Sequence, residues 1–186
     1  MQTSDIQNDK KRLLEILRNE AFFKEKVTLS SGKTSNFYID ARRVTLSPEG
    51  AYLCAKIILD LVQNDAIDAI GGPTLGADPI IGAIAALSFE CHHPLKTFIV
   101  RKAPKPYGKQ QQIEGPLLNQ GARVILVDDV TTTGQSILQS IDVLKEMDIK
   151  VNKAICIVDR REGAKEALAK RGCPLISIFN SSDFLK

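Results

Sequence analysis

Short apolar runs alternate with amphipathic stretches along most of the chain. Runs of five to eight residues rich in Val, Ile and Phe predict strands at 67–72, 97–101, 123–129, 153–160 and 175–179. Apolar residues at three- or four-residue intervals predict helices at 6–19, 48–63, 77–90, 134–147 and 162–172. This alternation is typical of an α/β domain, in which helices cover both faces of a mostly parallel sheet.

Two polar segments depart from the alternation. TLSSGKTSN at 28–36 is a turn segment that leads into the short apolar run 37–39. The stretch 102–121 has little periodicity, and twenty residues of this kind inside a compact domain predict a functional or disordered loop. No internal repeat, low-complexity tract or linker is present in the sequence, so we expect one domain over residues 1–186.

Composition narrows the class of protein. With 186 residues and 44% hydrophobic residues, the chain can form one globular core. A net charge of +3 does not by itself indicate a nucleic-acid or membrane partner. No apolar run is long enough to span a bilayer, and the N-terminal segment has polar residues where a signal peptide has an apolar core. We therefore expect a cytoplasmic protein.

Cysteines and histidines do not indicate a metal site. The four cysteines are far apart and form no C-x-x-C pair, so we interpret them as reduced core thiols. The adjacent His92 and His93 precede Pro94 and have no third ligand at metal spacing, which favours a loop.

The segment RVILVDDVTTTGQSI, residues 123–137, places two carboxylates directly after an apolar run. Ligands of open parallel sheets bind at the carboxyl ends of strands, where Asp128 and Asp129 are expected to lie. The turn that follows contains Gly134, whose backbone is permissive, and it leads into a helix whose free N–H groups attract anions. Further donors are the hydroxyls of Thr131, Thr132, Thr133 and Ser136. The segment therefore offers acceptors for sugar hydroxyls beside a cradle for a phosphate.

A surface loop with an aspartate N-cap is the simpler interpretation of this segment. It accounts for one carboxylate and one hydroxyl, but not for two acids, four hydroxyls and a glycine together. We therefore favour a phosphosugar site. The turn has neither the G-x-x-x-x-G-K-[ST] spacing of a P-loop nor the G-x-G-x-x-G spacing of a dinucleotide turn.

The same segment resembles the 5-phosphoribosyl-1-pyrophosphate (PRPP) motif of type I phosphoribosyltransferases. Three further stretches resemble the orotate phosphoribosyltransferases within that family: TLSSGKTSNFYID, VRKAPKPYGKQQQIEG and VDRREG. They correspond to a hood segment, a mobile catalytic loop, and a segment whose arginine holds the orotate carboxylate. The resemblance implies a type I phosphoribosyltransferase fold with a hood at about 1–45 and a mobile loop at about 102–120.

The resemblance also implies which residues bind PRPP. Asp128 and Asp129 would contact the ribose hydroxyls. The 5-phosphate would lie against the turn formed by Val130, Thr131, Thr132, Thr133, Gly134, Gln135 and Ser136. The pyrophosphate would contact residues 71–79 and four side chains of the loop: Arg101, Lys102, Lys105 and Tyr107. Part of the loop would reach the site of the neighbouring subunit in a homodimer.

Roles on the orotate side follow from the same resemblance. Thr132 and Arg160 would bind orotate, and Tyr38 would stack on its ring. Lys102, Lys105 and Asp129 would be the catalytic residues. Mg²⁺ would be held mainly through PRPP, with no direct protein ligand, as is usual for this ion.

Elementary chemistry agrees with these roles. Pyrophosphate leaves with several negative charges, and nearby cations lower that barrier. Four cations lie within nine residues of the loop: Arg101, Lys102, Lys105 and Lys109. A solvated basic loop is the simpler interpretation of this run by itself. Arg160 can hold a carboxylate through two parallel hydrogen bonds, but an ion pair with Asp159 or Glu162 is a competing explanation.

Four positions, in three segments, depart from the pattern of some relatives. Those proteins carry lysine at the position of Ser30 and in the pyrophosphate loop, where this chain has Leu75 and Gly76. Tyr107 replaces a histidine that is frequent in bacterial relatives, and a tyrosine does not titrate near neutral pH.

The resemblance implies an enzyme of pyrimidine (UMP) biosynthesis. It would transfer the phosphoribosyl group of PRPP to orotate and release orotidine 5′-phosphate and pyrophosphate, with no nucleic-acid or membrane partner. Two alternatives remain. A transferase for another base would have no role for Arg160, and a non-catalytic regulator that contacts nucleic acid would need an added DNA-binding segment.

Overall fold

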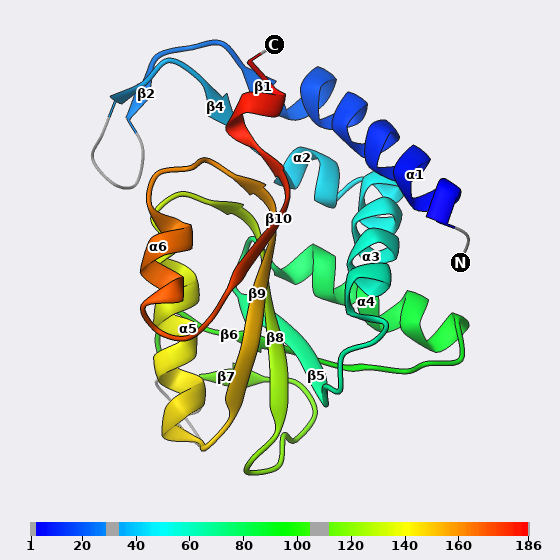
Figure 1. The fold of residues 1–186 in the computed structure, drawn as a ribbon, viewed down its shortest axis with the longest axis vertical. Coiled ribbons are helices and arrows are strands. Elements are labelled where there is room, and N and C mark those ends of the chain that lie inside the picture. The colour runs from blue at the N-terminus through cyan, green and yellow to red at the C-terminus, as the bar shows by residue number, and fades with distance from the viewer. Residues whose placement is uncertain (1–2, 29–33, 105–111, 186) are drawn as a thin grey trace.

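A six-stranded sheet forms the centre of the computed structural model, which describes residues 3–28, 34–104 and 112–185 (Figure 1). The strand order is β10-β9-β8-β5-β6-β7, and all neighbours are parallel except β6 and β7. The strands are β5 (Ala69–Pro73), β6 (Lys96–Val100), β7 (Ile113–Glu114), β8 (Arg123–Thr131), β9 (Lys150–Asp159) and β10 (Leu175–Asn180). Strand β8 therefore ends in the middle of the carboxyl edge of the sheet.

Helices cover both faces of this sheet (Figure 1). One face carries α3 (Pro48–Val62) and α4 (Asp78–Glu90), with α1 (Thr3–Ile16) packed against α3. The other carries α5 (Gln135–Glu146) and α6 (Ala164–Ala169).

Side chains of β8 alternate between the two cores. Ile125 and Val127 belong to the core under α3 and α4, whereas Val124 and Leu126 belong to the core under α5 and α6. This follows because successive side chains of a strand point to opposite faces of the sheet. The predicted α/β architecture is confirmed.

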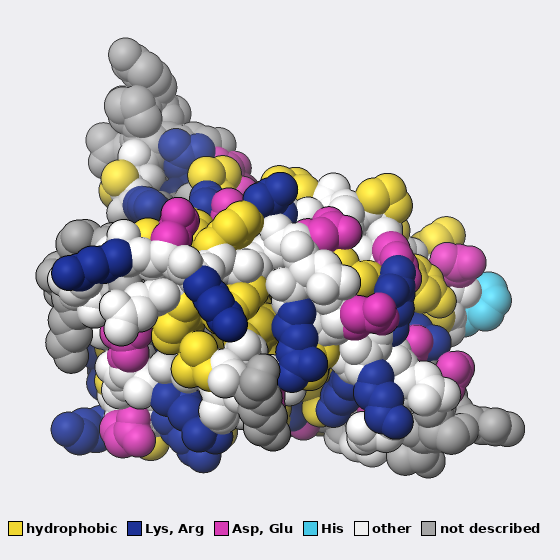
Figure 2. All heavy atoms as spheres, turned by 90° about the horizontal axis from the view of Figure 1, so that it is seen from above, with side chains coloured by type: hydrophobic (Ala, Val, Ile, Leu, Met, Phe, Trp, Pro, Cys, Tyr) yellow, Lys and Arg dark blue, Asp and Glu magenta, His cyan; other side chains and the backbone are white. Residues whose placement is uncertain are grey.

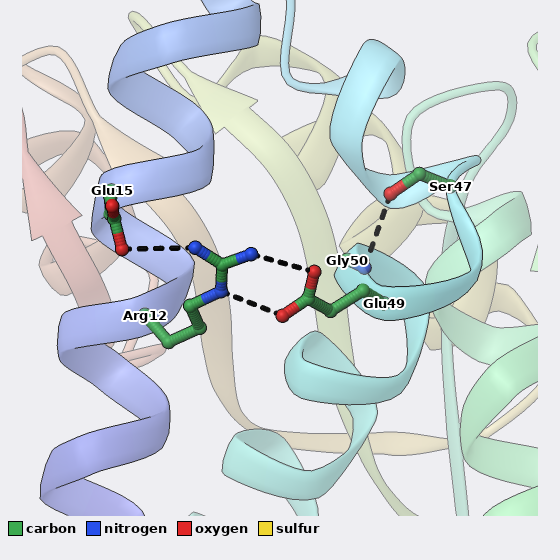
Figure 3. Close-up of polar contacts among 5 residues, drawn as sticks. All are labelled: Arg12, Glu15, Ser47, Glu49 and Gly50. Carbon is green, nitrogen blue, oxygen red and sulfur yellow. Dashed lines mark hydrogen bonds and ion pairs between the residues drawn. The ribbon is translucent and has the colours of Figure 1, made fainter.

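Helix α3 starts at a polar cap and is tied there to α1. The Oγ of Ser47 accepts a hydrogen bond from the N–H of Gly50 at 3.2 Å. The guanidinium of Arg12 contacts both carboxylate oxygens of Glu49, at 2.7 and 3.0 Å, and one of Glu15 at 3.0 Å (Figure 3). The hydrogen bonds from Arg12 lower the pKa of Glu49. Because the pair is exposed, it links α1 to α3 but contributes little to stability.

Two small antiparallel pairs of strands lie above the carboxyl edge of the main sheet (Figure 1). β1 (Phe22–Phe23) pairs with β4 (Tyr38–Ile39), and β2 (Val27–Thr28) pairs with β3 (Thr34–Ser35). We call these two pairs of strands the hood. A π-helical turn, Leu17–Ala21, joins α1 to the hood, and the short helix α2 (Arg42–Thr45) follows it.

The observed elements differ from the expected ones mainly at their ends. Strand β8 continues two residues past its predicted end, to Thr131, because Val130 and Thr131 pair with Val158 and Asp159 of β9. The stretch 102–121 contains the two-residue strand β7, which pairs antiparallel with β6. Helix α6 covers six residues where eleven were expected.

Candidate active site

Asp128 and Asp129 are consecutive residues near the carboxyl end of β8. Asp128 is 7% exposed, and its Oδ1 accepts the N–H of Asp129 at 3.0 Å. Oδ1 of Asp129 accepts the N–H of Val130 at 2.7 Å. Burial raises the pKa of both carboxyls, and for Asp128 the charge of Asp129 adds to the rise. A buried acid beside a partly buried one destabilises a folded chain, so this pair indicates a ligand that uses them as acceptors.

The turn after β8 leads directly into α5. Gly134 caps this helix with a φ of 79°, a left-handed conformation that strains other residues. Thr132 and Ser136 line the cavity beside the acids, whereas Thr133 and Gln135 are exposed. Because Ser136 belongs to the first turn of α5, the positive end of that helix borders the ligand space, where an anion is favoured.

The loop between β5 and α4 approaches the acid pair from the neighbouring strand. Thr74 and Gly76 both line the cavity, and the peptide bond from Thr74 to Leu75 is cis. A β-carbon on Gly76 would stand 2.3 Å from Oδ1 of Asp129 and 2.6 Å from Oδ1 of Asp128. The backbone of this loop can therefore lie against the carboxylates only because residue 76 has no side chain.

One cavity of about 450 Å³ joins these parts. Its lining comes from the hood, α2, the β5–α4 loop, the end of β6, the β8–α5 turn and the end of β9. The residues are Tyr38, Ile39, Asp40, Arg42, Pro73, Thr74, Leu75, Gly76, Lys102, Asp128, Asp129, Val130, Thr132, Ser136 and Arg160. A site at the carboxyl edge of a parallel sheet, with convergent polar groups, is where α/β proteins bind their ligands.

Arg160 follows β9 and reaches the cavity although its side chain is only 3% exposed. Its Nε donates to Oε1 of Glu162 at 3.0 Å, and its Cζ lies 4.5 Å from the centre of the Phe37 ring. Arg160 therefore forms the ion pair with Glu162 that was the alternative explanation for this residue. It also lines the cavity, so the ion pair does not exclude binding of a ligand. Asp159 instead accepts the N–H of Arg161 at 2.8 Å.

Asp40 and Arg42 are lining residues that the sequence analysis did not single out. The Nε of Arg42 contacts Oδ1 of Asp40 at 3.1 Å, which raises the pKa of Arg42. The positive charge of Arg42 in turn acts to lower the pKa of Asp129 against the larger effect of burial. The adjacent basic residues at 42 and 43, directly after the hood segment, were the only available signal.

The two described basic residues of the loop after β6 have different surroundings. Lys102 lines both the cavity with the acids and an adjoining cavity, whereas Arg101 contacts Oε1 of Glu114 at 3.3 Å and lines the adjoining cavity. Lys105, Tyr107 and Lys109, like Ser30, lie outside the described residues. Figure 2 looks onto the end of the molecule that carries the hood, where many Lys and Arg side chains are exposed.

No group of three or more His, Cys, Asp or Glu side chains in the described part of the chain is arranged to hold a metal ion. The acid pair at the cavity could contribute to Mg²⁺ binding only together with oxygens of a ligand. Within the described residues, no helix is both long and apolar enough to cross a membrane.

Comparison with known proteins agrees with this fold. The family model of the phosphoribosyl transferase domain matches residues 42–182. The fold and the cavity therefore define a phosphoribosyltransferase domain.

Individual relatives narrow the family. The chain is 46% identical to the orotate phosphoribosyltransferase of Aquifex aeolicus (strain VF5) over 176 residues, which cover 95% of this chain and 93% of that protein. The crystal structure of the Mycobacterium tuberculosis H37Rv orotate phosphoribosyltransferase in complex with Fe(III) dicitrate matches with a TM-score of 0.81 and 34% identity, over 95% of this chain and 98% of that chain. The structure of that enzyme in complex with PRPP matches with a TM-score of 0.78 and 32% identity, over 96% and 99% of the two chains. The chain belongs to the orotate phosphoribosyltransferase family.

Proposed function

We infer that the protein transfers the 5-phosphoribosyl group from PRPP to orotate, giving orotidine 5′-phosphate and pyrophosphate in de novo pyrimidine (UMP) biosynthesis. The observation that carries this inference is the single cavity that joins the Asp128–Asp129 pair with Arg160 on the next strand. One end of that cavity suits a phosphorylated ribose, and the other offers a guanidinium for an anionic base.

The proposed mechanism places PRPP along the β8–α5 turn. Ribose hydroxyls donate to the carboxylates of Asp128 and Asp129, and the 5-phosphate accepts from backbone N–H groups and hydroxyls between Val130 and Ser136. Orotate N1 attacks C1 of the ribose from the face opposite the pyrophosphate and gives up its proton to solvent, while the pyrophosphate leaves with the bonding electron pair. C1 inverts through a transition state with cationic character, and the negative carboxylates at the ribose help to stabilise it.

Cations on the pyrophosphate side offset the charge that grows on the leaving group. Lys102 lines the cavity and is proposed to do this, with Lys105, Arg101 and Tyr107 as further contacts. The loop around Gly76 would supply backbone groups in place of the lysine found in some relatives. Mg²⁺, when bound through pyrophosphate and ribose oxygens, would neutralise part of the same charge.

On the base side, Arg160 is proposed to hold the orotate carboxylate, with Thr132 and Tyr38 contacting the ring. A carboxylate is what distinguishes orotate from uracil, and a planar guanidinium is well shaped to bind it. Losing a hydrogen bond to a charged group costs about 1.5–3 kcal/mol, which corresponds to roughly ten- to a hundred-fold in affinity. Arg160→Ala is therefore expected to weaken orotate by that factor and to leave PRPP nearly unaffected.

Thermal shift with orotate, uracil, adenine or hypoxanthine, each with PRPP and Mg²⁺, tests the choice of base. We expect a shift beyond that of PRPP and Mg²⁺ alone only with orotate. Arg160→Lys is the matched variant, because it keeps the charge and loses the planar fork. A purine that stabilises the parent as strongly as orotate does would refute the proposed substrate, as would parental orotate affinity in Arg160→Ala by calorimetry.

We further propose that the chain is a single domain over 1–186 in a cytoplasmic homodimer, with the hood within about 1–45 and a loop at about 102–120 that completes the neighbouring site. Lys102 lines the cavity of its own chain, so the contribution to the neighbour is assigned to Lys105. Mixing an Asp128→Asn/Asp129→Asn double variant with Lys105→Ala is expected to restore part of the activity, because one hybrid site has both intact halves.

The same mixture with Lys102→Ala is the control and is expected to stay inactive. If subunits exchange and Lys105→Ala also fails to recover, the loop acts within its own chain. Recovery with both lysine variants would place Lys102 in the neighbouring site as well.

A further inference from the structure

The guanidinium of Arg160 is held from two directions by side chains that line no part of the proposed PRPP site. Glu162 accepts from its Nε at 3.0 Å, and the Phe37 ring lies under its Cζ at 4.5 Å. With a side chain only 3% exposed, this cation has lost most of its water. Contacts that replace that water decide which way the planar fork faces.

Phe37 is the first of three aromatic residues in contact. Its ring centre lies 5.8 Å from that of Phe22 in β1, at an interplanar angle of 37°. Phe22 stacks in turn on Phe184 near the C-terminus, with 5.7 Å between ring centres and an angle of 29°. Phe184 is only 4% exposed. We call Phe37, Phe22 and Phe184 the aromatic column. These distances are typical of favourable ring pairs.

The C-terminal segment that carries Phe184 is itself fixed. A short 3-10 turn, Ser181–Asp183, follows β10 and starts with a capping box, in which the Asn180 N–H donates to Oδ2 of Asp183 at 2.8 Å. Oγ of Ser181 donates to the carbonyl oxygen of Arg160 at 3.2 Å. The Nε of Arg18 donates to the carbonyl oxygen of Asp183 at 3.0 Å. Figure 1 shows this segment beside β1 and the end of α1.

We propose that the aromatic column positions Arg160 for the carboxylate of an anionic base, with Phe37 as the positioning residue that acts on the guanidinium directly. The C-terminal segment would then reach the base site twice, through Phe184 and Phe22 to the side chain and through Ser181 to the backbone. The inference rests on the proposed function, because it needs Arg160 to read the carboxylate.

The physical reason is geometric. A guanidinium that rotates about its own side chain offers two parallel N–H bonds for only part of the time, whereas one stacked on a ring keeps its plane. Glu162 fixes the Nε edge, and the ring fixes the plane, so the two contacts restrict different motions. Leucine has nearly the volume of phenylalanine but no ring face, and it would keep the packing of the hood while freeing the plane of Arg160.

The test compares Phe37→Leu with Phe37→Tyr, which keeps the ring. Phe37→Leu is expected to weaken orotate binding by roughly five- to thirty-fold, the loss of one desolvated cation–ring contact. PRPP affinity should stay within about twofold, because Phe37 is not among the residues that line the cavity with the acid pair and the β8–α5 turn. Phe37→Tyr should restore orotate binding. Calorimetry with each ligand separately gives both affinities.

A double-mutant cycle shows whether the effect passes through Arg160. In an Arg160→Ala background, Phe37→Leu is expected to have no further effect on orotate, since the contact it removes is already gone. If the two losses add instead, Phe37 acts through the neighbouring Tyr38 and the proposal is wrong. Equal weakening of PRPP and orotate would reduce Phe37 to a general support of the hood, which also overturns it.

The variant Phe184→Leu tests the far end of the aromatic column, at a residue that does not line the cavity. It is expected to weaken orotate in the same direction by a smaller factor, with PRPP unchanged, and it replaces Phe37→Leu if that variant fails to fold. Parental orotate affinity in Phe184→Leu would remove the C-terminal segment from the proposal. If the parent protein does not bind orotate, the proposed function is wrong. This outcome can be distinguished from failure of the aromatic column, in which the parent binds orotate and the Phe37 variants bind it equally well.

Discussion

Gly76 is the position where a single methyl group should disable the site. An ideal β-carbon there would stand 2.3 Å from Oδ1 and 2.9 Å from Cγ of Asp129, and 2.6 Å from Oδ1 of Asp128. Ordinary contact begins near 3.4 Å, so Gly76→Ala requires the carboxylates or the loop to move by about 1 Å. The carboxylates are not free to swing, because each Oδ1 also accepts a backbone N–H of β8.

The size of the expected effect follows from that displacement. Misplacing a binding group by 1 Å can lower catalysis by about a hundredfold, and both acids are displaced together here. Inserting a methyl group into a packed site costs about 1–3 kcal/mol in stability. We therefore expect Gly76→Ala to lower kcat/KM for PRPP by about a hundredfold. The loss in the free energy of unfolding should be smaller than the total stability of a typical domain, so the variant should still fold.

Gly82→Ala is the matched control. Gly82 lies in the middle of α4, where an added β-carbon would meet nothing within 4 Å. Alanine favours a helix over glycine by about 1 kcal/mol, so this variant is expected to melt a few degrees higher than the parent. Steady-state kinetics of the two variants give kcat/KM for PRPP, and thermal denaturation gives their Tm. Parental PRPP kinetics in Gly76→Ala would refute the argument that the loop needs a glycine against the acids.

Three further variants test the acid pair, the loop cation and the start of α3. Because burial raises the pKa of Asp128, the folded protein binds its proton more tightly than the unfolded chain, so stability falls as pH rises from the ordinary carboxyl value of 3.8 through the raised value. Asp128→Asn should flatten this fall and raise the Tm at neutral pH while removing the stabilisation by PRPP; a neutral-pH Tm no higher than that of the parent would contradict this. Lys102→Ala should lower kcat far more than it raises the KM for orotate, because its cation acts on charge that develops as pyrophosphate leaves. Steady-state kinetics that showed only raised KM values would reduce Lys102 to a binding residue. Ser47→Ala removes the cap of α3 and should cost about 1 kcal/mol in urea denaturation with kcat/KM unchanged; equal urea midpoints would mean that the 3.2 Å hydrogen bond contributes nothing.

The amino-acid sequence determined the order and type of the main elements and the core of the site. Apolar runs and helical periods are local properties, so the five long parallel strands and the helices that cover them could be predicted with errors near their ends. The two-residue strands of the hood, β7 and the short helix α2 are too short to leave such a pattern and were not predicted. Asp128, Asp129 and the turn to Gly134 are contiguous in sequence, and their chemistry can be recognised without knowing what faces them. Arg160 was identified differently, through the resemblance of the segment VDRREG to a family motif, because its chemistry alone left an ion pair with Asp159 or Glu162 as a competing explanation.

Tertiary structure decided which distant residues meet these groups. Gly76 lies against the acids because β5 is the sheet neighbour of β8, and Arg42 enters the cavity because α2 follows the hood. The contact between Phe37 and Arg160 joins residues that are far apart in the chain. None of these three contacts leaves a local periodic signal, since strand order and the path of the connections are set by packing of the whole sheet and its helices. The sequence therefore specified the candidate groups of the site, whereas the fold specified their neighbours and, through burial, the direction in which the pKa of the acids is shifted.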